Sequence, residues 1–83
     1  METIIHPLST EKSIRLMESE NVLVFIVKKS AKKAEIKKDL EESFKMKVDK
    51  ITTTILPDGR KKAYVRINRA TPAIDVATQL GMI

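Results

Sequence analysis

The sequence predicts one α+β domain over residues 1–83, in which a mostly antiparallel, three- to four-stranded sheet is flanked by helices. Two observations predict this fold class. Runs of β-branched and aromatic residues at 21–29, 48–56 and 61–68 have the composition of strands. The segments around these runs carry helix-capping residues and apolar residues at helical spacing. A chain of 83 residues fits one hydrophobic core and is too short for two.

The first half of the chain begins with helix signals and continues with a strand. The stretch HPLSTEKSIRLMESE predicts a helix that Ser9 or Thr10 can cap, with Ile14 and Met17 facing inward. A short strand can precede this helix at residues 3–5. The stretch NVLVFIVKK is an unbroken apolar run, which is typical of a central strand that is covered on both faces.

Two further helices are predicted, one before and one after the last two strands along the chain. In SAKKAEIKKDLEESFK, Ser30 is the expected N-cap. The apolar stripe of this helix has one residue every four positions: Ile36, Leu40 and Phe44. In TPAIDVATQLGMI, Thr71 is the expected cap, Pro72 the first helical residue, and Gly81 the residue just past the end.

The turn between the last two strands decides which side chains share a face. A two-residue turn would separate the apolar residues of the two strands, whereas a three-residue loop at 57–59 keeps them together and suits the left-handed conformation that Gly59 can adopt. The expected core-facing residues are Ile51, Thr53, Ile55, Ala63, Val65 and Ile67. The expected cross-strand pairs are Thr54 with Lys62, Thr52 with Tyr64, and Lys50 with Arg66.

Positive charge is concentrated in the middle of the chain. The net charge is +5, but residues 28–69 carry 14 Lys or Arg against 6 Asp or Glu, a local charge of +8. The segments on either side together carry −3. Lysines and arginines that served only solubility would be spread more evenly along the chain. Their concentration in the middle therefore predicts one polyanionic partner.

The predicted register also gathers cations around the only tyrosine. The face of the hairpin that points away from the core would carry Lys50, Thr52, Thr54, Lys62, Tyr64, Arg66 and Asn68. Lysine and arginine neutralise phosphates, threonine and asparagine add neutral donors, and an aromatic ring stacks on a base or packs against ribose. Lys50 opposite Arg66 is a like-charge pair that a bound anion would bridge. The pattern predicts nucleic-acid binding, although an ordinary solvated sheet face has a similar composition.

The preceding helix can extend this basic surface. Lys33 and Lys37 would add cations near one end of the sheet, next to a helix N-terminus that favours anions. Opposite charges at helical spacing, such as Glu35 with Lys38, offer the alternative of a salt-bridged surface helix.

Enzymatic functions find little support. The chain has no cysteine, and its single histidine, His6, is expected in a loop without a catalytic or metal-binding constellation. We therefore expect no catalytic residue, no metal site, no cofactor and no small-molecule substrate. An acylphosphatase-like fold would need a phosphate-binding loop, which is missing although Arg66 and Asn68 are present. No apolar run approaches the roughly 20 residues of a membrane span, and the start of the chain does not look like a signal peptide.

Three motifs resemble one family. HPLSTEK, KKAEIKK and DGRKKAYVRI occur here in the order and spacing of the large-ribosomal-subunit protein L twenty-three, and the resemblance covers essentially the whole chain. It implies a cytoplasmic ribosomal protein that binds large-subunit ribosomal RNA near the exit of the peptide tunnel. The short loop at 57–59, the ending AIDVATQLGMI and the lack of a long basic N-terminal extension resemble the archaeal type. A free-standing RNA-binding module of another pathway is the alternative.

The resemblance also implies roles for particular residues. Lys61, Lys62 and Tyr64 match the RNA-contacting strand motif of the family, to which we add the neighbouring Arg60, and Lys33 and Lys37 match its basic helix. Thr52 departs from the asparagine that many members have.

The acidic start of the chain is the expected protein-docking side. Glu11 matches an exposed acidic residue that docks a chaperone in bacterial members, and Glu18 lies on the same helix; Glu11 also suits the positive end of the helix dipole. The expected protein partners are neighbouring large-subunit ribosomal proteins and, at the tunnel exit, signal recognition particle, the nascent-chain-associated complex or the protein-conducting channel.

Overall fold

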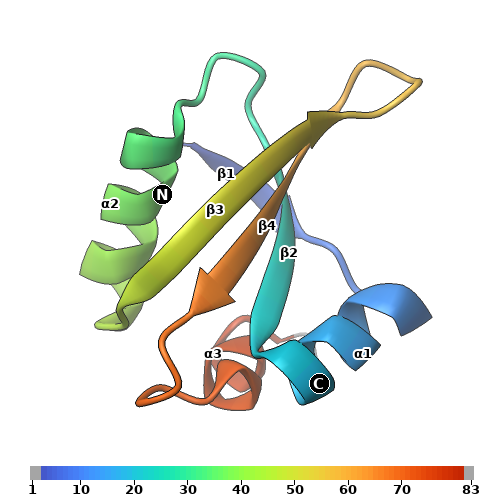
Figure 1. Cartoon of the computed structure of the whole chain (residues 1–83). Coiled ribbons are helices and arrows are strands. Elements are labelled where there is room, and N and C mark those ends of the chain that lie inside the picture. Colours follow the sequence, from blue (N-terminus) through green and yellow to red (C-terminus); the bar gives the residue numbers. More distant parts are fainter. Residues whose placement is uncertain (1–2, 82–83) are drawn as a thin grey trace.

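An antiparallel four-stranded sheet and three helices form the part of the chain that the computed structural model describes, residues 3–81 (Figure 1). The predicted α+β class is therefore confirmed. The elements follow one another as β1 (Ile4–Pro7), α1 (Glu11–Glu20), β2 (Val22–Val27), α2 (Lys33–Phe44), β3 (Val48–Ile55), β4 (Lys61–Ile67) and α3 (Ala73–Gln79). The strand expected at residues 3–5 is present, with its bounds shifted toward the C-terminus.

The strands lie in the order β1-β2-β4-β3, so that β2 and β4 are central and β3 is an edge strand. All six residues of β2 are buried, which confirms the prediction of a central strand covered on both faces. One face of β2, with Leu23, Phe25 and Val27, belongs to the main core. The other face lies beside the long side chains of β4, because Val24 pairs with Tyr64.

The core lies between the sheet and helices α2 and α3, with α1 packed beside β2. The predicted stripe of α2 is confirmed: Ile36 and Leu40 are fully buried, and Phe44 packs against the core with part of its surface exposed. From α1, Met17 is buried and Ile14 is partly buried, as expected. Each fully buried aliphatic or aromatic side chain contributes about 2 kcal/mol of hydrophobic stabilisation.

Two of the predicted helix caps are wrong, while Thr10 is the N-cap of α1. The N-cap of α2 is Lys32 instead of Ser30, because the Glu35 side chain turns back and accepts the backbone N–H of Lys32 at 2.9 Å. Helix α3 begins after Pro72 instead of Thr71.

The first N–H of α3 is satisfied by a residue far away in the sequence. Asn21 Oδ1 accepts the N–H of Ala73 at 2.6 Å, and its Nδ2 donates to the carbonyls of Ile67 at 2.9 Å and Thr71 at 3.1 Å. Asn21 has φ +58°, in the left-handed region that asparagine tolerates better than most residues. One side chain therefore joins the end of α1, the end of β4 and the start of α3.

The hairpin of β3 and β4 has the predicted register. Thr52 pairs with Tyr64, Thr54 with Lys62, and Lys50 with Arg66. Leu56 N–H donates to the Arg60 carbonyl at 2.8 Å and Gly59 has φ +93°, which confirms the three-residue loop with a left-handed last residue.

One predicted core residue of this hairpin is wrong. Ile55 is 61% exposed, because the hairpin extends beyond the helices that cover the rest of the sheet (Figure 1). The register also shifts between Val48 and Lys50, where Asp49 forms a bulge at the opposite end of β3.

Candidate nucleic-acid interface

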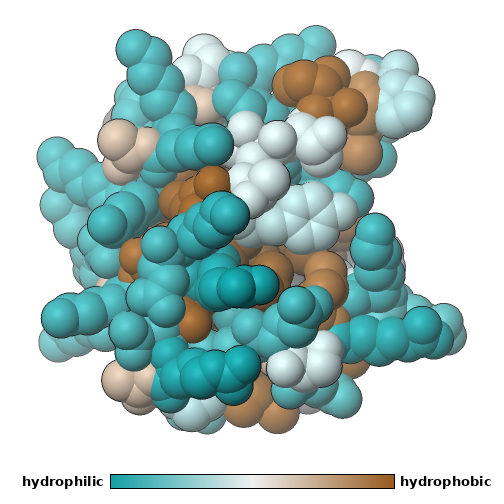
Figure 2. Space-filling view, in the orientation of Figure 1, coloured by the Kyte–Doolittle hydropathy of each residue, from teal (hydrophilic) through white to brown (hydrophobic). Residues whose placement is uncertain are grey.

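The sheet face opposite α2 and α3 presents the predicted basic residues of the hairpin. We call outer face the surface made by Lys50, Thr52, Thr54, Lys62, Tyr64 and Arg66. These residues share a face because side chains alternate along a strand and the core takes the other set. In the space-filling view, side chains of intermediate hydropathy cross the sheet, with hydrophilic side chains on their left and hydrophobic patches at their upper right and below (Figure 2).

A shallow hollow of about 120 Å³ lies at the centre of the outer face. Its walls are Lys50, Thr52, Tyr64 and Arg66, and Val22 of β2 also lines it. The aromatic ring, two cationic groups and a hydroxyl thus surround one space. This arrangement can accept a phosphate beside a base or ribose.

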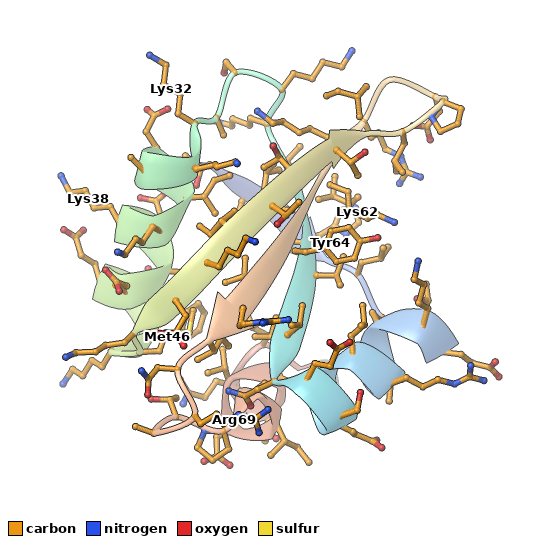
Figure 3. The ribbon with its side chains drawn as sticks, viewed as in Figure 1. Lys32, Lys38, Met46, Lys62, Tyr64 and Arg69 are labelled. Atoms are coloured by element: carbon orange, nitrogen blue, oxygen red, sulfur yellow. The ribbon has the colours of Figure 1, made fainter. Side chains whose placement is uncertain are left out.

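Lys62 lies beside Tyr64, and the charge of Lys12 also acts on it. Lys62 Nζ lies 5.1 Å from the centroid of the Tyr64 ring, and Figure 3 shows the two side chains next to each other on the sheet. A hydrogen bond from Lys62 and the charges of Lys62 and Lys12 lower the pKa of Tyr64 from its ordinary value of 10.0, against the opposing effect of burial. Lys12 of α1 therefore adds to the positive potential at Tyr64, although the start of the chain is predicted to be the acidic, protein-docking side.

The two cations of the predicted anion-bridging pair differ in their surroundings. Arg66 pairs with Glu20 of α1 at 3.7 Å, both side chains being about half exposed, whereas Lys50 is in no ion pair with a described residue. No local pattern predicts the Glu20 contact, because it joins residues 46 positions apart. A phosphate bound between Lys50 and Arg66 would therefore compete with Glu20 for the arginine.

Two other predicted RNA-binding residues, Lys61 and Asn68, make hydrogen bonds within the protein. Lys61 Nζ donates to the Ala31 carbonyl at 2.7 Å, on the sheet face opposite Lys62. Asn68 donates to Asp49 Oδ1 at 3.2 Å and accepts the N–H of Ala70 at 2.9 Å. The structure thus separates Lys61 from the outer face and holds Asn68 in the turn after β4.

Arg60 lies in the hairpin loop, where it contacts its own turn. Its Nε donates to Asp58 Oδ2 at 2.7 Å, with both side chains about half exposed. The backbone N–H and the guanidinium of Arg60 lower the pKa of Asp58 below 3.8. Arg60 is accessible from the tip of the hairpin, but one acceptor already occupies it.

Lys33 and Lys37 lie beside the β3 edge of the sheet and not on the outer face. Together with Ala34 they line a groove between α2 and β3, and Lys50 lines the same groove from the strand. Lys32 and Lys38 instead point away from the sheet (Figure 3). The structure therefore connects Lys33 and Lys37 to the outer face through Lys50.

The predicted docking residues lie on α1. Glu11 and Glu18 are exposed and seven positions apart, which places them on one side of the helix. Glu11 makes a weak ion pair with Arg15 at 3.8 Å, with both side chains at least 80% exposed. The acidic side of α1 is free to contact a partner.

The comparison with protein families decides the assignment. The family described as Ribosomal protein L23 matches residues 2–74, which is most of the chain. This chain belongs to the ribosomal protein L23 family. The Large ribosomal subunit protein uL23 of Trypanosoma brucei brucei is 41% identical to it over 80 residues, which cover 96% of this chain and 49% of that relative. The chain thus spans about half the length of this L23-family relative.

The L23 match includes every predicted RNA-binding and docking residue, since all of them lie within residues 2–74. Membership of the L23 family assigns no contact to any single residue, so the individual contacts stay predictions. Members of this family are structural ribosomal proteins without enzymatic activity. Within residues 3–81, no cluster of metal-binding side chains and no helix of membrane-spanning length is present.

Proposed function

We propose that this chain is a structural constituent of the large ribosomal subunit that binds large-subunit ribosomal RNA through its outer face. Family membership supports the ribosomal assignment. The observation that carries the choice of surface is the central hollow, where Tyr64 lies beside Lys50 and Arg66. We place the protein in the cytoplasmic ribosome, beside neighbouring large-subunit proteins.

The outer face binds by shape and phosphate contacts. Lys50, Lys62 and Arg66 neutralise phosphates, the two exposed threonines donate to phosphate or ribose oxygens, and the Tyr64 ring stacks or packs on a sugar. A flat sheet face with one aromatic residue has few groups that read base edges. The protein therefore recognises an RNA surface of matching shape more than a base sequence.

A salt series with large-subunit ribosomal RNA and excess transfer RNA as competitor tests this proposal. Three phosphate contacts predict a log–log slope of about −2 to −3 for the binding constant against salt. Binding that survives the competitor supports a specific ribosomal site. If transfer RNA competes equally, the outer face binds polyanions in general. If the protein is absent from purified large subunits, it is the free-standing RNA-binding module.

The acidic side of α1 is the proposed docking surface at the tunnel exit. Glu11 and Glu18 are exposed, and they lie on a helix that packs mainly against β2 and α3. The proposed partners are signal recognition particle, the nascent-chain-associated complex or the protein-conducting channel. Ribosomes that carry Glu11→Lys and Glu18→Lys should bind their factor more weakly, while Glu42→Lys on α2 should have no effect. Equal losses in both would contradict the docking role of α1.

The archaeal type is a finer proposal within the family. The support for it is the three-residue loop that ends at Gly59, which leaves no long hairpin extension between β3 and β4. A relative with the same short loop and higher identity from an archaeon would strengthen the proposal. Higher identity to eukaryotic members throughout the chain would contradict it.

A further inference from the structure

The free edge of β3 carries backbone groups that can pair with another strand. β3 is at one side of the sheet, and its register with β4 directs the backbone N–H and C=O groups of Lys50, Thr52 and Thr54 toward β4. The groups of Ile51, Thr53 and Ile55 consequently point away from the sheet. No described residue pairs with them on that side. An edge of this kind is a template for an added strand.

A mostly apolar groove runs beside this edge. It has a volume of about 160 Å³ and lies between α2 and β3, with Ala34, Val48 and Ile51 supplying apolar surface. Figure 2 shows hydrophobic residues recessed between hydrophilic side chains on the part of the surface where α2 and β3 lie. The hollow at the centre of the outer face has a mainly polar lining, so the two sites suit different chemistry.

Three lysines and one carboxylate line the groove, and that carboxylate, Asp49, accepts a hydrogen bond from Asn68. Lys33 and Lys37 line it from α2 and Lys50 lines it from β3, and none of them is in an ion pair with a described residue. Lys32, the N-cap of α2, and Lys38 within the helix point away (Figure 3). The positive charge beside the strand edge is therefore available to an acidic partner.

From these features we infer that β3 accepts an extended acidic segment of a partner protein as an additional strand. The backbone of that segment pairs with Ile51, Thr53 and Ile55, one of its apolar side chains enters the groove, and its carboxylates contact the three lysines. RNA fits the groove less well, because nucleic acid does not pair with a strand edge and phosphate gains nothing from an apolar floor. This site shares Lys50 with the RNA-binding outer face, but its backbone pairing groups lie on the edge of the sheet.

Amide hydrogen exchange of the full chain, followed by NMR, tests the inference. The probe is a short peptide of alternating valine and glutamate, and a peptide of the same composition with its glutamates in one block is the control. The alternating peptide should slow exchange at Ile51, Thr53 and Ile55 by about tenfold when present at about ten times its Kd. The amides of Thr52 and Thr54 already donate to β4 and serve as internal references.

Two variants separate strand addition from general attraction. Thr53→Pro removes an outward N–H, which an edge strand tolerates, and should abolish protection at Ile51 and Ile55. Lys37→Glu should weaken the peptide about fivefold, whereas the matched change Lys38→Glu on the far side of α2 should leave its affinity unchanged. Circular dichroism verifies that each variant is folded.

Three results would overturn the inference. The first is equal protection by the block peptide, which indicates charge attraction without strand pairing. The second is an equal loss of affinity in the Lys37 and Lys38 variants. The third is protection of the β3 edge by polyuridylate RNA and not by the peptide, which would assign the groove to RNA.

Discussion

Replacement of Asn21 should destabilise the protein more than its partly exposed position suggests. Its side chain makes three hydrogen bonds of 3.1 Å or less, to Ile67, Thr71 and Ala73, which join three elements at the lower end of the sheet. Arg66 of the outer face directly precedes one of these residues. The side chain of Asn21 therefore supports both the fold and one border of the proposed RNA surface.

The expected loss follows from these contacts. Each hydrogen bond contributes about 1 kcal/mol net, so removal of the side chain costs about 3 kcal/mol. In Asn21→Ala the new residue must also hold φ +58°, which adds about 1 kcal/mol. Asn21→Gly avoids that strain and should lose about 3 kcal/mol instead of about 4.

Urea unfolding followed by circular dichroism measures both losses. For a domain of this size, about 4 kcal/mol corresponds to a decrease in Tm of roughly 15–30 °C. The glycine variant should fall between the alanine variant and the unchanged protein. A loss below about 1 kcal/mol for Asn21→Ala, with an unchanged m-value, would refute the role assigned to this side chain.

Three further predictions concern the lysines. Lys62→Met should move the pKa of Tyr64 back toward 10.0 in a tyrosinate absorbance titration. Because the folded-state pKa is lowered, tyrosinate stabilises the fold above pH 10, and this contribution is lost as the pH falls through the folded-state pKa. Lys50→Thr should stabilise the free protein by about 0.5 kcal/mol and reduce the RNA salt slope by about one; an unchanged slope would contradict the phosphate contact. Lys61→Met should destabilise the protein by about 1 kcal/mol by freeing the Ala31 carbonyl, and an unchanged unfolding midpoint would contradict this.

The hairpin was predictable from the sequence to the level of single pairs. Apolar and polar residues alternate strictly on both strands, so the two apolar sets share a face only when the loop has three residues. Gly59 suits the left-handed end of such a loop. The outer face followed from that register. These features depend on residues close together in the sequence, where local rules are strong.

The wrong and missing predictions depend on tertiary contacts. Thr71 is a suitable N-cap by composition, but α3 receives its cap from Asn21, 52 positions before Ala73. Glu20 reaches Arg66 only because α1 packs beside β2. Ile55 has the alternation of a core residue, yet no helix covers it at the tip of the hairpin. Local patterns carry no information about which distant element fills such a position.

The most direct test of the RNA-binding surface compares two charge reversals. Lys62→Glu changes the outer face, and Lys38→Glu makes the same change in net charge on the far side of α2. Tyr64 is the only tyrosine and there is no tryptophan, so its fluorescence reports binding of large-subunit ribosomal RNA without labels. Lys62→Glu should lower the affinity about tenfold and the salt slope by about one, and Lys38→Glu should change neither. Equal losses in the two variants would contradict the account.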